Sequence, residues 1–261
     1  MDQETYARSV LHRFNMSECA SAKYPEESAP LTKTKDGDEL AAAPYREAVG
    51  ALMYLTITRP DISHAVGQVA RYCSEPARKH WTAVKQILRY IKGTVGKGIR
   101  FQRGNRAELT GYADANWAGC PDTRRSVTGY VFKFAGGAIT WQSKVQKTCA
   151  LSSTEGEYMA LAAACQEVKR LRQLLTELGF GPTGETTIYE DNQACIKLSE
   201  NPHAHGRTKH IDVRHHFIRE LVAQGEVKIE YIPSKRNIAD IFTKGVTGKL
   251  YSLLTQKAGV I

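Results

Sequence analysis

The stretch TEGEYMALAAACQEVKRLRQLLTEL, from Thr154 to Leu178, has the apolar spacing of one long helix. Its apolar residues recur three and four positions apart and form a single stripe, made of Leu161, Ala164, Val168, Leu171 and Leu175. Gly179 follows directly and favours the end of the helix at that point. Because an α-helix turns by about 100° per residue, Glu157 falls on the centre of the stripe and Glu155 on the other side.

Strand patterns come before this helix, and strands alternate with helices after it. The pattern before it predicts three strands, at 108–117, 129–134 and 138–142, with a turn at Gly136-Gly137 between the last two. The pattern after it predicts strands at 186–190 and 227–232, helices at 192–199 and 208–223, and a short helix following Asn237. Three consecutive strands followed by alternating elements predict an α/β fold, with a mixed sheet and helices packed on its faces.

The part of the chain before residue 106 has a different pattern. Residues 1 to about 45 show no period and are interpreted as loop or extended arm. Apolar stripes then predict three helices, at 45–58, after Pro60, and at 77–92. We therefore divide the chain into a largely helical segment (1–105), an α/β domain (106–245) and a C-terminal tail (246–261).

Composition narrows the class of partner. The 261 residues carry a net charge of +9, which favours a polyanion, nucleic acid first and an anionic membrane second. No run approaches the ~20 apolar residues that a spanning helix needs, and the N-terminus lacks the pattern of a signal peptide. The six cysteines form no CxxC pair, which argues against a zinc ribbon and a dense disulfide framework. We expect a chain that is not secreted and has no membrane partner.

Four acidic residues lie where predicted elements begin or end: Asp114, Glu157, Asp191 and Asp240. A carboxylate that points at a core is costly unless something pairs with it, and a metal ion would do so. Each residue also has a purely structural interpretation. Asp114 fits a turn, Asp191 a helix cap, and Asp240 a helix first turn.

For Glu157 the structural alternative is a capping box with Thr154, and Ser152 with Glu155 has the same S/T-x-x-E spacing. Taken one by one, the structural interpretations of the four acidic residues are favoured. Taken together, they require four coincidences at the edge of one sheet.

Five segments, in this order along the chain, resemble the ribonuclease H region of copia-type retrotransposon Pol polyproteins. They are GYADANWAG (111–119), SSTEGEYMA (152–160), YEDNQ (189–193), RTKHID (207–212) and NIADIFTK (237–244). Two further segments, YREAVGALMYL (45–55) and TRPDI (58–62), look like the stretch between the polymerase palm and ribonuclease H in those polyproteins. The resemblance covers nearly the whole chain and implies a ribonuclease H-like, five-stranded mixed sheet behind the C-terminal part of a reverse transcriptase.

The resemblance also implies a chemistry. It assigns the four carboxylates Asp114, Glu157, Asp191 and Asp240 to catalysis and metal binding. Two Mg²⁺ ions about 4 Å apart, with Mn²⁺ as a substitute, would serve cleavage of the RNA strand of an RNA–DNA hybrid during reverse transcription. The expected products carry 3′-hydroxyl and 5′-phosphate ends. The expected partners are the hybrid and the reverse-transcriptase and integrase parts of the same polyprotein, in the cytoplasm, in transposon particles or in the nucleus.

The sequence departs from the wider family at two places. Cellular ribonucleases H carry a histidine in the loop before the last aspartate, whereas the loop here is IPSKRN (232–237). Three histidines lie on the preceding predicted helix, and their roles stay open; the pattern around His215 favours a buried structural residue over a catalytic one, and the others are His210 and His216. The Tyr-x-Asp-Asp signature of a polymerase is absent from these residues.

Basic residues suggest where nucleic acid would lie. The segment 77–107 contains no acidic residue and has Trp81 and Tyr90 among its basic side chains, a combination that suits backbone tracking. The alternative is a solvated helix face. The nucleic-acid-binding residues that we expect are Arg78, Lys79, Lys85, Arg89, Lys92, Arg124, Arg125, Lys144 and Lys235.

Two rival functions follow from the same residues. One is a catalytically inactive nucleic-acid-binding remnant of a transposon polyprotein, against which the four intact carboxylates argue. The other is an integrase core, which shares the fold class but would need a different acidic order ending in glutamate.

Overall fold

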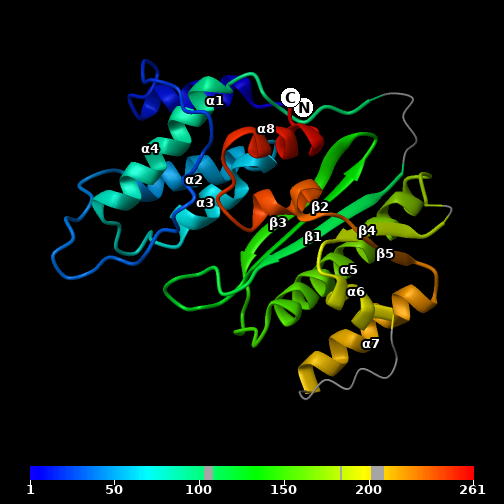
Figure 1. The fold of residues 1–261 in the computed structure, drawn as a ribbon. Helices are drawn as coiled ribbons and strands as arrows, with labels where there is room; N and C mark the ends of the chain where they lie inside the picture. Colours follow the sequence, from blue (N-terminus) through cyan, green and yellow to red (C-terminus); the bar gives the residue numbers. More distant parts are fainter. Residues whose placement is uncertain (103–107, 183, 201–208) are drawn as a thin grey trace.

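The computed structural model in Figure 1 describes residues 1–102, 108–182, 184–200 and 209–261, the last range without the side chains of 209–215. A five-stranded sheet runs through its centre, with the strand order β3-β2-β1-β4-β5. Its strands are β1 (Thr110–Asn116), β2 (Val127–Phe134), β3 (Gly137–Val145), β4 (Thr186–Glu190) and β5 (Val227–Tyr231). The mixed sheet predicted from the sequence is confirmed.

The directions of the strands place several chain segments at one edge of the sheet. β1 pairs with β2, and β2 with β3, in antiparallel fashion, whereas β1–β4 and β4–β5 are parallel pairs. The carboxyl ends of β1, β3, β4 and β5 therefore lie at the same edge. Helix α5 (Ser153–Glu177) follows β3 and begins at that edge as well. We call it the carboxyl edge of the sheet.

The two faces of the sheet pack into different cores, because side chains alternate along a strand. On β2, Tyr130 and Phe132 belong to the core beneath α5, and Val131 belongs to the core on the opposite face. The stripe predicted for α5 is buried, with relative exposures of 0 to 6%. Helices α6 (Gln193–Glu200) and α7 (Lys209–Ala223) lie on the α5 side of the sheet (Figure 1).

The opposite face carries the N-terminal half of the chain. Its helices are α1 (Glu4–Arg13), α2 (Tyr45–Leu55), α3 (Ser63–Ala70) and α4 (Arg78–Gly93), with a short 3₁₀ helix, η1 (Pro60–Ile62), before α3. The mainly helical segment is therefore confirmed. The expectation of an irregular chain up to about residue 45 is wrong for α1, where Ala7, Val10 and Leu11 form a short buried stripe among polar residues. Residues 14–43 form no helix and are called the arm below.

The C-terminal residues return to the N-terminal half. Two 3₁₀ helices, η2 (Ser234–Arg236) and η3 (Ile238–Phe242), precede α8 (Gly248–Lys257), a helix that the sequence analysis placed in a tail. The Tyr251 hydroxyl donates to the carbonyl of Asp61 at 2.9 Å, and Leu254 is fully buried in the core of the N-terminal helices. This core crosses both proposed boundaries, so the division at 105/106 and 245/246 stays a prediction.

Two other expectations can be checked on the described residues. All six cysteines lie in the described part of the chain and are unpaired thiols. Within the described residues, none of the helices has the length and apolar character needed to cross a membrane.

Candidate active site

Three of the four predicted carboxylates converge at the carboxyl edge of the sheet. Asp114 comes from β1, Glu157 from the start of α5, and Asp191 from the residue directly after β4. One carboxylate oxygen from each lies within 4.8 Å of the others. Asp114 and Glu157 are buried, at 2% and 8% exposure, and Asp191 is half-buried. The cluster therefore joins three segments that are far apart in the sequence.

The start of α5 explains why Glu157, rather than Glu155, faces the cluster. Ser152 is the N-cap, and its hydroxyl accepts the backbone N–H of Glu155 at 3.1 Å. The Glu155 carboxylate turns back and accepts the N–H of Leu151 at 2.7 Å. Glu157 points the other way and accepts a backbone hydrogen bond from Ala115 of β1. Glu155 is thus the capping residue, and the alternative interpretation of Glu157 as a cap is wrong.

The fourth carboxylate, Asp240, is on η3 and lies beside the other three. The backbone carbonyl of Ala113 accepts a hydrogen bond from the Asn237 amide at 2.8 Å, which ties η3 to β1. The Thr243 hydroxyl donates to the Asp114 carboxylate, and the Lys244 ammonium pairs with Asp240 at 2.8 Å. Asp240 is not one of the three residues within 4.8 Å, but it interacts electrostatically with Asp114 and Asp191.

Burial and mutual repulsion raise the pKa values of these carboxyl groups. Burial, and then the charges of Glu190, Asp114 and Asp191, raise the pKa of Glu157 to about 11. Burial and the charge of Asp114 raise the pKa of Asp240 to about 7, against the opposing effect of Lys244. Burial also raises the pKa of Asp114, again against Lys244. Each of these carboxyl groups therefore holds its proton more tightly than an exposed carboxyl group does.

Two charged members of this site, Glu190 and Lys244, were not predicted from the sequence. Glu190 is fully buried, and its carboxylate accepts the backbone N–H groups of Asp191 and Asn192 at 3.2 and 3.1 Å. The burial of Glu190 could have been predicted, because side chains alternate along a strand and Glu190 falls on the same face of β4 as the buried residues Thr186 and Ile188. For Lys244 the signal was its position four residues after Asp240, within the same motif.

The donor set suits a hard divalent cation. Carboxylate oxygens are the ligands that Mg²⁺ and Ca²⁺ prefer. Among the described residues, Glu157 Oε2 and Glu190 Oε2 are buried oxygens with no hydrogen-bond partner. Buried oxygens of this kind are costly unless a partner satisfies them. The residues present therefore fit the metal that the sequence analysis expected.

The predicted nucleic-acid-binding residues fall into two groups. Arg124, Arg125, Lys144 and Lys235 are exposed and follow or end strands at the carboxyl edge. The other five are on α4, in the N-terminal half of the chain. Two of them already pair with the arm: Arg78 with Glu39 and Lys79 with Asp38, both at 2.8 Å. The remaining three, Lys85, Arg89 and Lys92, are exposed or half-buried.

The three histidines before the last aspartate lie on α7. His216 is exposed. The prediction that His215 is a buried structural residue, like any role for His210, lies outside the side chains that the structure describes.

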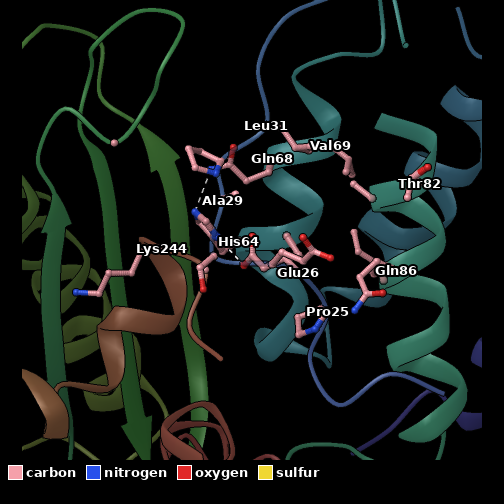
Figure 2. Close-up of a pocket in the computed structure, with 18 of the residues that line it drawn as sticks. Pro25, Glu26, Ala29, Leu31, His64, Gln68, Val69, Thr82, Gln86 and Lys244 are labelled. Atoms are coloured by element: carbon pink, nitrogen blue, oxygen red, sulfur yellow. Dashed lines mark hydrogen bonds and ion pairs between the residues drawn. The ribbon is translucent and has the colours of Figure 1, made fainter. Parts of the chain in front are cut away.

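A cavity of about 270 Å³ adjoins the site on the helical side. Figure 2 shows Ala29 and Leu31 of the arm facing α3 and α4 across it, with Lys244 on the sheet side. Its polar groups bind one another: Glu26 contacts His64 at 2.7 Å, and His64 contacts Gln68 at 3.0 Å. The cavity therefore lies between the arm and the helices, and the polar contacts along it attach the arm to α3.

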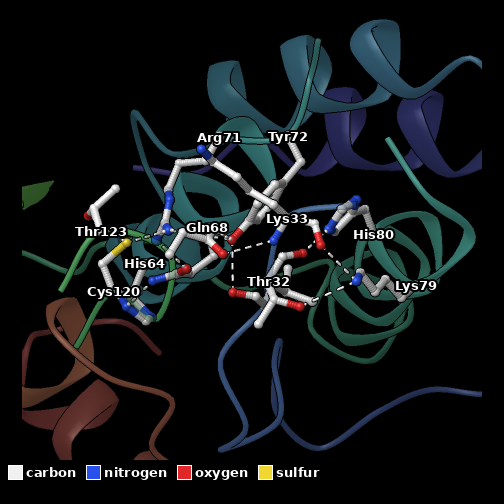
Figure 3. Close-up of polar contacts among 12 residues, drawn as sticks. Thr32, Lys33, His64, Gln68, Arg71, Tyr72, Lys79, His80, Cys120 and Thr123 are labelled. Atoms are coloured by element: carbon white, nitrogen blue, oxygen red, sulfur yellow. Dashed lines mark hydrogen bonds and ion pairs between the residues drawn. The ribbon is translucent and has the colours of Figure 1, made fainter. Parts of the chain in front are cut away.

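A second set of contacts joins the arm and the residues just after α3 to residues 117–126, the β1–β2 loop (Figure 3). Asp122 in this loop accepts the backbone N–H of Lys33 at 3.0 Å and the hydroxyl of Tyr72 at 2.9 Å. Arg71 donates to the sulfur of Cys120 at 2.8 Å. The loop that follows the Asp114 strand is thus held by two segments from the helical half.

Two curated proteins are similar in sequence to this chain along its whole length. The chain is 44% identical over 269 residues to the retrovirus-related Pol polyprotein from transposon TNT 1-94 of Nicotiana tabacum, covering 100% of the chain and 20% of that protein. It is 37% identical over 262 residues to the Pol polyprotein from transposon RE2 of Arabidopsis thaliana, covering 100% of the chain and 18% of that protein. No family model matches the chain.

Among solved structures, the chain is similar to LC11-RNase H1, isolated from compost by a metagenomic approach. The TM-score is 0.41 and the identity 16%, with 52% of this chain and 93% of that chain covered.

The strand order, the long helix across the sheet and the acidic carboxyl edge define an α/β protein with a mixed five-stranded sheet, flanked by helices, and an acidic site at one edge. Over its whole length the chain is similar to retrovirus-related Pol polyproteins of transposons. It spans about a fifth of the length of these two relatives, at 20% and 18%.

Proposed function

We propose that this chain is a metal-dependent endoribonuclease that cleaves the RNA strand of RNA–DNA hybrids during retrotransposon reverse transcription. The observation that carries the proposal is the convergence of Asp114, Glu157 and Asp191, with ligand oxygens within 4.8 Å of one another. The sequence similarity to transposon Pol polyproteins supports this function, because those proteins are retrovirus-related.

The same three residues, with Asp240 beside them, would hold Mg²⁺, and Mn²⁺ could replace it. A metal held there would supply activation of the attacking water and stabilisation of the leaving oxygen of the phosphodiester. The chain's own groups position this site. Asn237 ties η3 to β1, Glu190 holds the backbone at Asp191, and Lys244 offsets part of the negative charge that an incoming phosphate would meet.

The substrate contacts and the biological setting are part of the proposal. The exposed basic residues at the carboxyl edge would contact phosphates, and recognition of the hybrid would rest on backbone and groove shape rather than sequence. The remaining reverse-transcriptase and integrase parts of the polyprotein are the proposed partners. The proposed location is the cytoplasm, including transposon particles, with a nuclear phase also compatible.

The direct experiment is to incubate purified chain with an end-labelled RNA–DNA hybrid and Mg²⁺. We expect RNA fragments with 3′-hydroxyl ends, no cleavage in EDTA, and no extension of a primer by this chain alone. The matched control is Asp114→Asn with the same hybrid. A chain that binds the hybrid but leaves its RNA intact with both Mg²⁺ and Mn²⁺ would instead be the inactive binding remnant.

A further inference from the structure

Trp117 is a large aromatic side chain that the fold leaves open to solvent beside the candidate site. It is 49% exposed, and it lies three residues after Asp114, directly beyond the end of β1. Its indole N–H donates to the carbonyl of Ala150 at 3.1 Å. This bond joins the loop that follows β1, the strand of Asp114, to the segment that precedes α5, the helix of Glu157. The ring is thus pinned in place while about half of its surface faces water.

The β1–β2 loop, which carries the Trp117 ring, is held in place by several contacts. The backbone N–H of Ala118 donates to the Ser126 hydroxyl at 3.2 Å. Further along, Arg71 binds Cys120, and the backbone of Lys33 and the Tyr72 hydroxyl bind Asp122 (Figure 3). A ring on an anchored loop loses little conformational freedom when a ligand covers it, which favours binding.

The surroundings of the ring indicate what would cover it. Leu151, which follows Ala150, is 83% exposed and adds apolar surface. Four exposed basic side chains lie on segments that meet the same edge of the sheet, in the β1–β2 loop and at or just after the end of β3: Arg124, Arg125, Lys144 and Lys147. An apolar face and several cations at one edge of the sheet match the chemistry of a nucleic acid, whose sugars and bases lie between phosphates. An apolar protein partner would leave these four charges without a matching group.

We propose that Trp117 is a stacking platform, which packs against a sugar or base edge of the RNA–DNA hybrid next to the acidic cluster. The inference rests on the proposed function, because it takes the hybrid as the ligand, and it names a contact that basic residues alone do not provide. Phosphate contacts set affinity, salt dependence and orientation on the duplex, whereas an aromatic contact adds apolar packing against one nucleotide, here beside the carboxylates. Trp117 is therefore a substrate-positioning residue.

The first test measures binding without cleavage. A fluorescein-labelled RNA–DNA hybrid is titrated in EDTA at low salt with the wild-type chain and with Trp117→Ala, Trp117→Phe and Phe180→Ala. Phe180 is the matched control, since its ring is 60% exposed but lies beyond the other end of α5. We expect Trp117→Ala to weaken binding roughly 5- to 150-fold, the effect of losing one stacked base, and Trp117→Phe to retain most of the affinity. Phe180→Ala should bind as the wild type does.

The second test observes the ring itself. A Trp81→Phe/Trp141→Phe chain keeps Trp117 as its single tryptophan. Its fluorescence should be quenched as the hybrid binds, with the same midpoint as the fluorescein signal. Melting temperatures of all variants show whether each is folded.

The outcomes separate the platform from the nuclease. Unchanged affinity in folded Trp117→Ala, or unquenched fluorescence when the hybrid is bound, overturns the platform even if the chain cleaves RNA. Binding that depends on Trp117 without any cleavage in Mg²⁺ overturns the nuclease activity alone. A wild-type chain that does not bind the hybrid overturns both.

Discussion

The ammonium of Lys244 lies 2.8 Å from a carboxylate oxygen of Asp240, so the chain supplies one cation of its own to the acidic site. Burial alone would lower the pKa of Lys244, but the carboxylates of Asp114 and Asp240 raise it above its usual value. Lys244 therefore stays charged and offsets part of the repulsion that the converging carboxylates create. It also lines the cavity beneath the arm, and so borders both the carboxyl edge of the sheet and the N-terminal helices.

Removing this internal cation should make the fold depend more on metal. We expect Lys244→Gln to lower the melting temperature in EDTA, because the repulsion among the carboxylates is then less compensated. The rise in melting temperature on adding Mg²⁺ should be larger than in the wild type, since the metal restores the missing charge. Lys249→Gln, an exposed lysine on α8, is the control. Identical EDTA melting temperatures for Lys244→Gln and Lys249→Gln would contradict this role.

Substitution of a carboxylate of the acidic site should reduce hybrid cleavage far more than substitution of the capping glutamate, Glu155. Asp114→Asn and Glu157→Gln should each reduce hybrid cleavage by about 100-fold or more, the scale typical of losing one group that stabilises a transition state. Glu155→Gln should cost far less activity, because Glu155 only caps α5. Initial rates at saturating Mg²⁺ measure this. If Glu155→Gln were the more damaging of the two glutamate variants, the wrong glutamate would have been assigned.

The metal-free chain should lose stability as pH rises. The ordinary pKa values of 4.5 for Glu157 and 3.8 for Asp240 rise in the folded chain to about 11 and about 7. The folded state therefore binds more protons than the unfolded state between these limits, and its free energy of unfolding falls as pH rises through them. In EDTA, urea unfolding midpoints should decline from about pH 5 to about pH 9. Glu157→Gln should flatten the decline; an unchanged slope in that variant would rule out Glu157 as the source.

Basic residues of α4 that contact the hybrid should contribute to the salt dependence of hybrid binding. If Lys85 and Lys92 contact phosphates, Lys85→Gln and Lys92→Gln should each reduce the slope of log K against log salt by roughly 0.7–0.9. Lys169→Gln, an exposed lysine on α5, is the control and should leave the slope unchanged. Equal slopes for the α4 variants and the control would mean that this helix face contacts solvent or protein.

The buried ion pair of the helical half should be costly to break from one side. Arg59 and Asp61 are buried and pair at 2.8 Å, and the Tyr90 hydroxyl also donates to Asp61. Asp61→Ala leaves a buried guanidinium unpaired, so we expect a loss of about 3–5 kcal/mol in the free energy of unfolding. The double variant Arg59→Met/Asp61→Leu should lose less, because no charge is left without a partner. Urea unfolding compares the two, and a double variant less stable than Asp61→Ala would refute this reasoning.

Local patterns were enough to predict the elements and one decisive orientation. The order of strands and helices, the class of the sheet and the buried stripe of α5 all follow from periodicities of two and 3.6 residues, which neighbouring residues alone establish. The same geometry placed Glu157, and not Glu155, on the buried stripe of the helix. It failed at α1, where only three buried residues mark the helix, and at α8, whose buried residues Tyr251 and Leu254 meet a partner almost two hundred positions earlier in the chain.

The charge balance of the site depended on the tertiary structure. Glu190 enters the cluster because β4 lies beside β1, and Lys244 because η3 is tied to that same strand through Asn237. The position of Trp117 beside α5 and the attachment of its loop to the arm depend likewise on contacts between distant segments. Sequence by itself determined which residues could carry the chemistry, since residue type and spacing are local properties. Only the packing of distant segments decided which charges meet, because burial and Coulomb interactions depend on distance in space rather than along the chain.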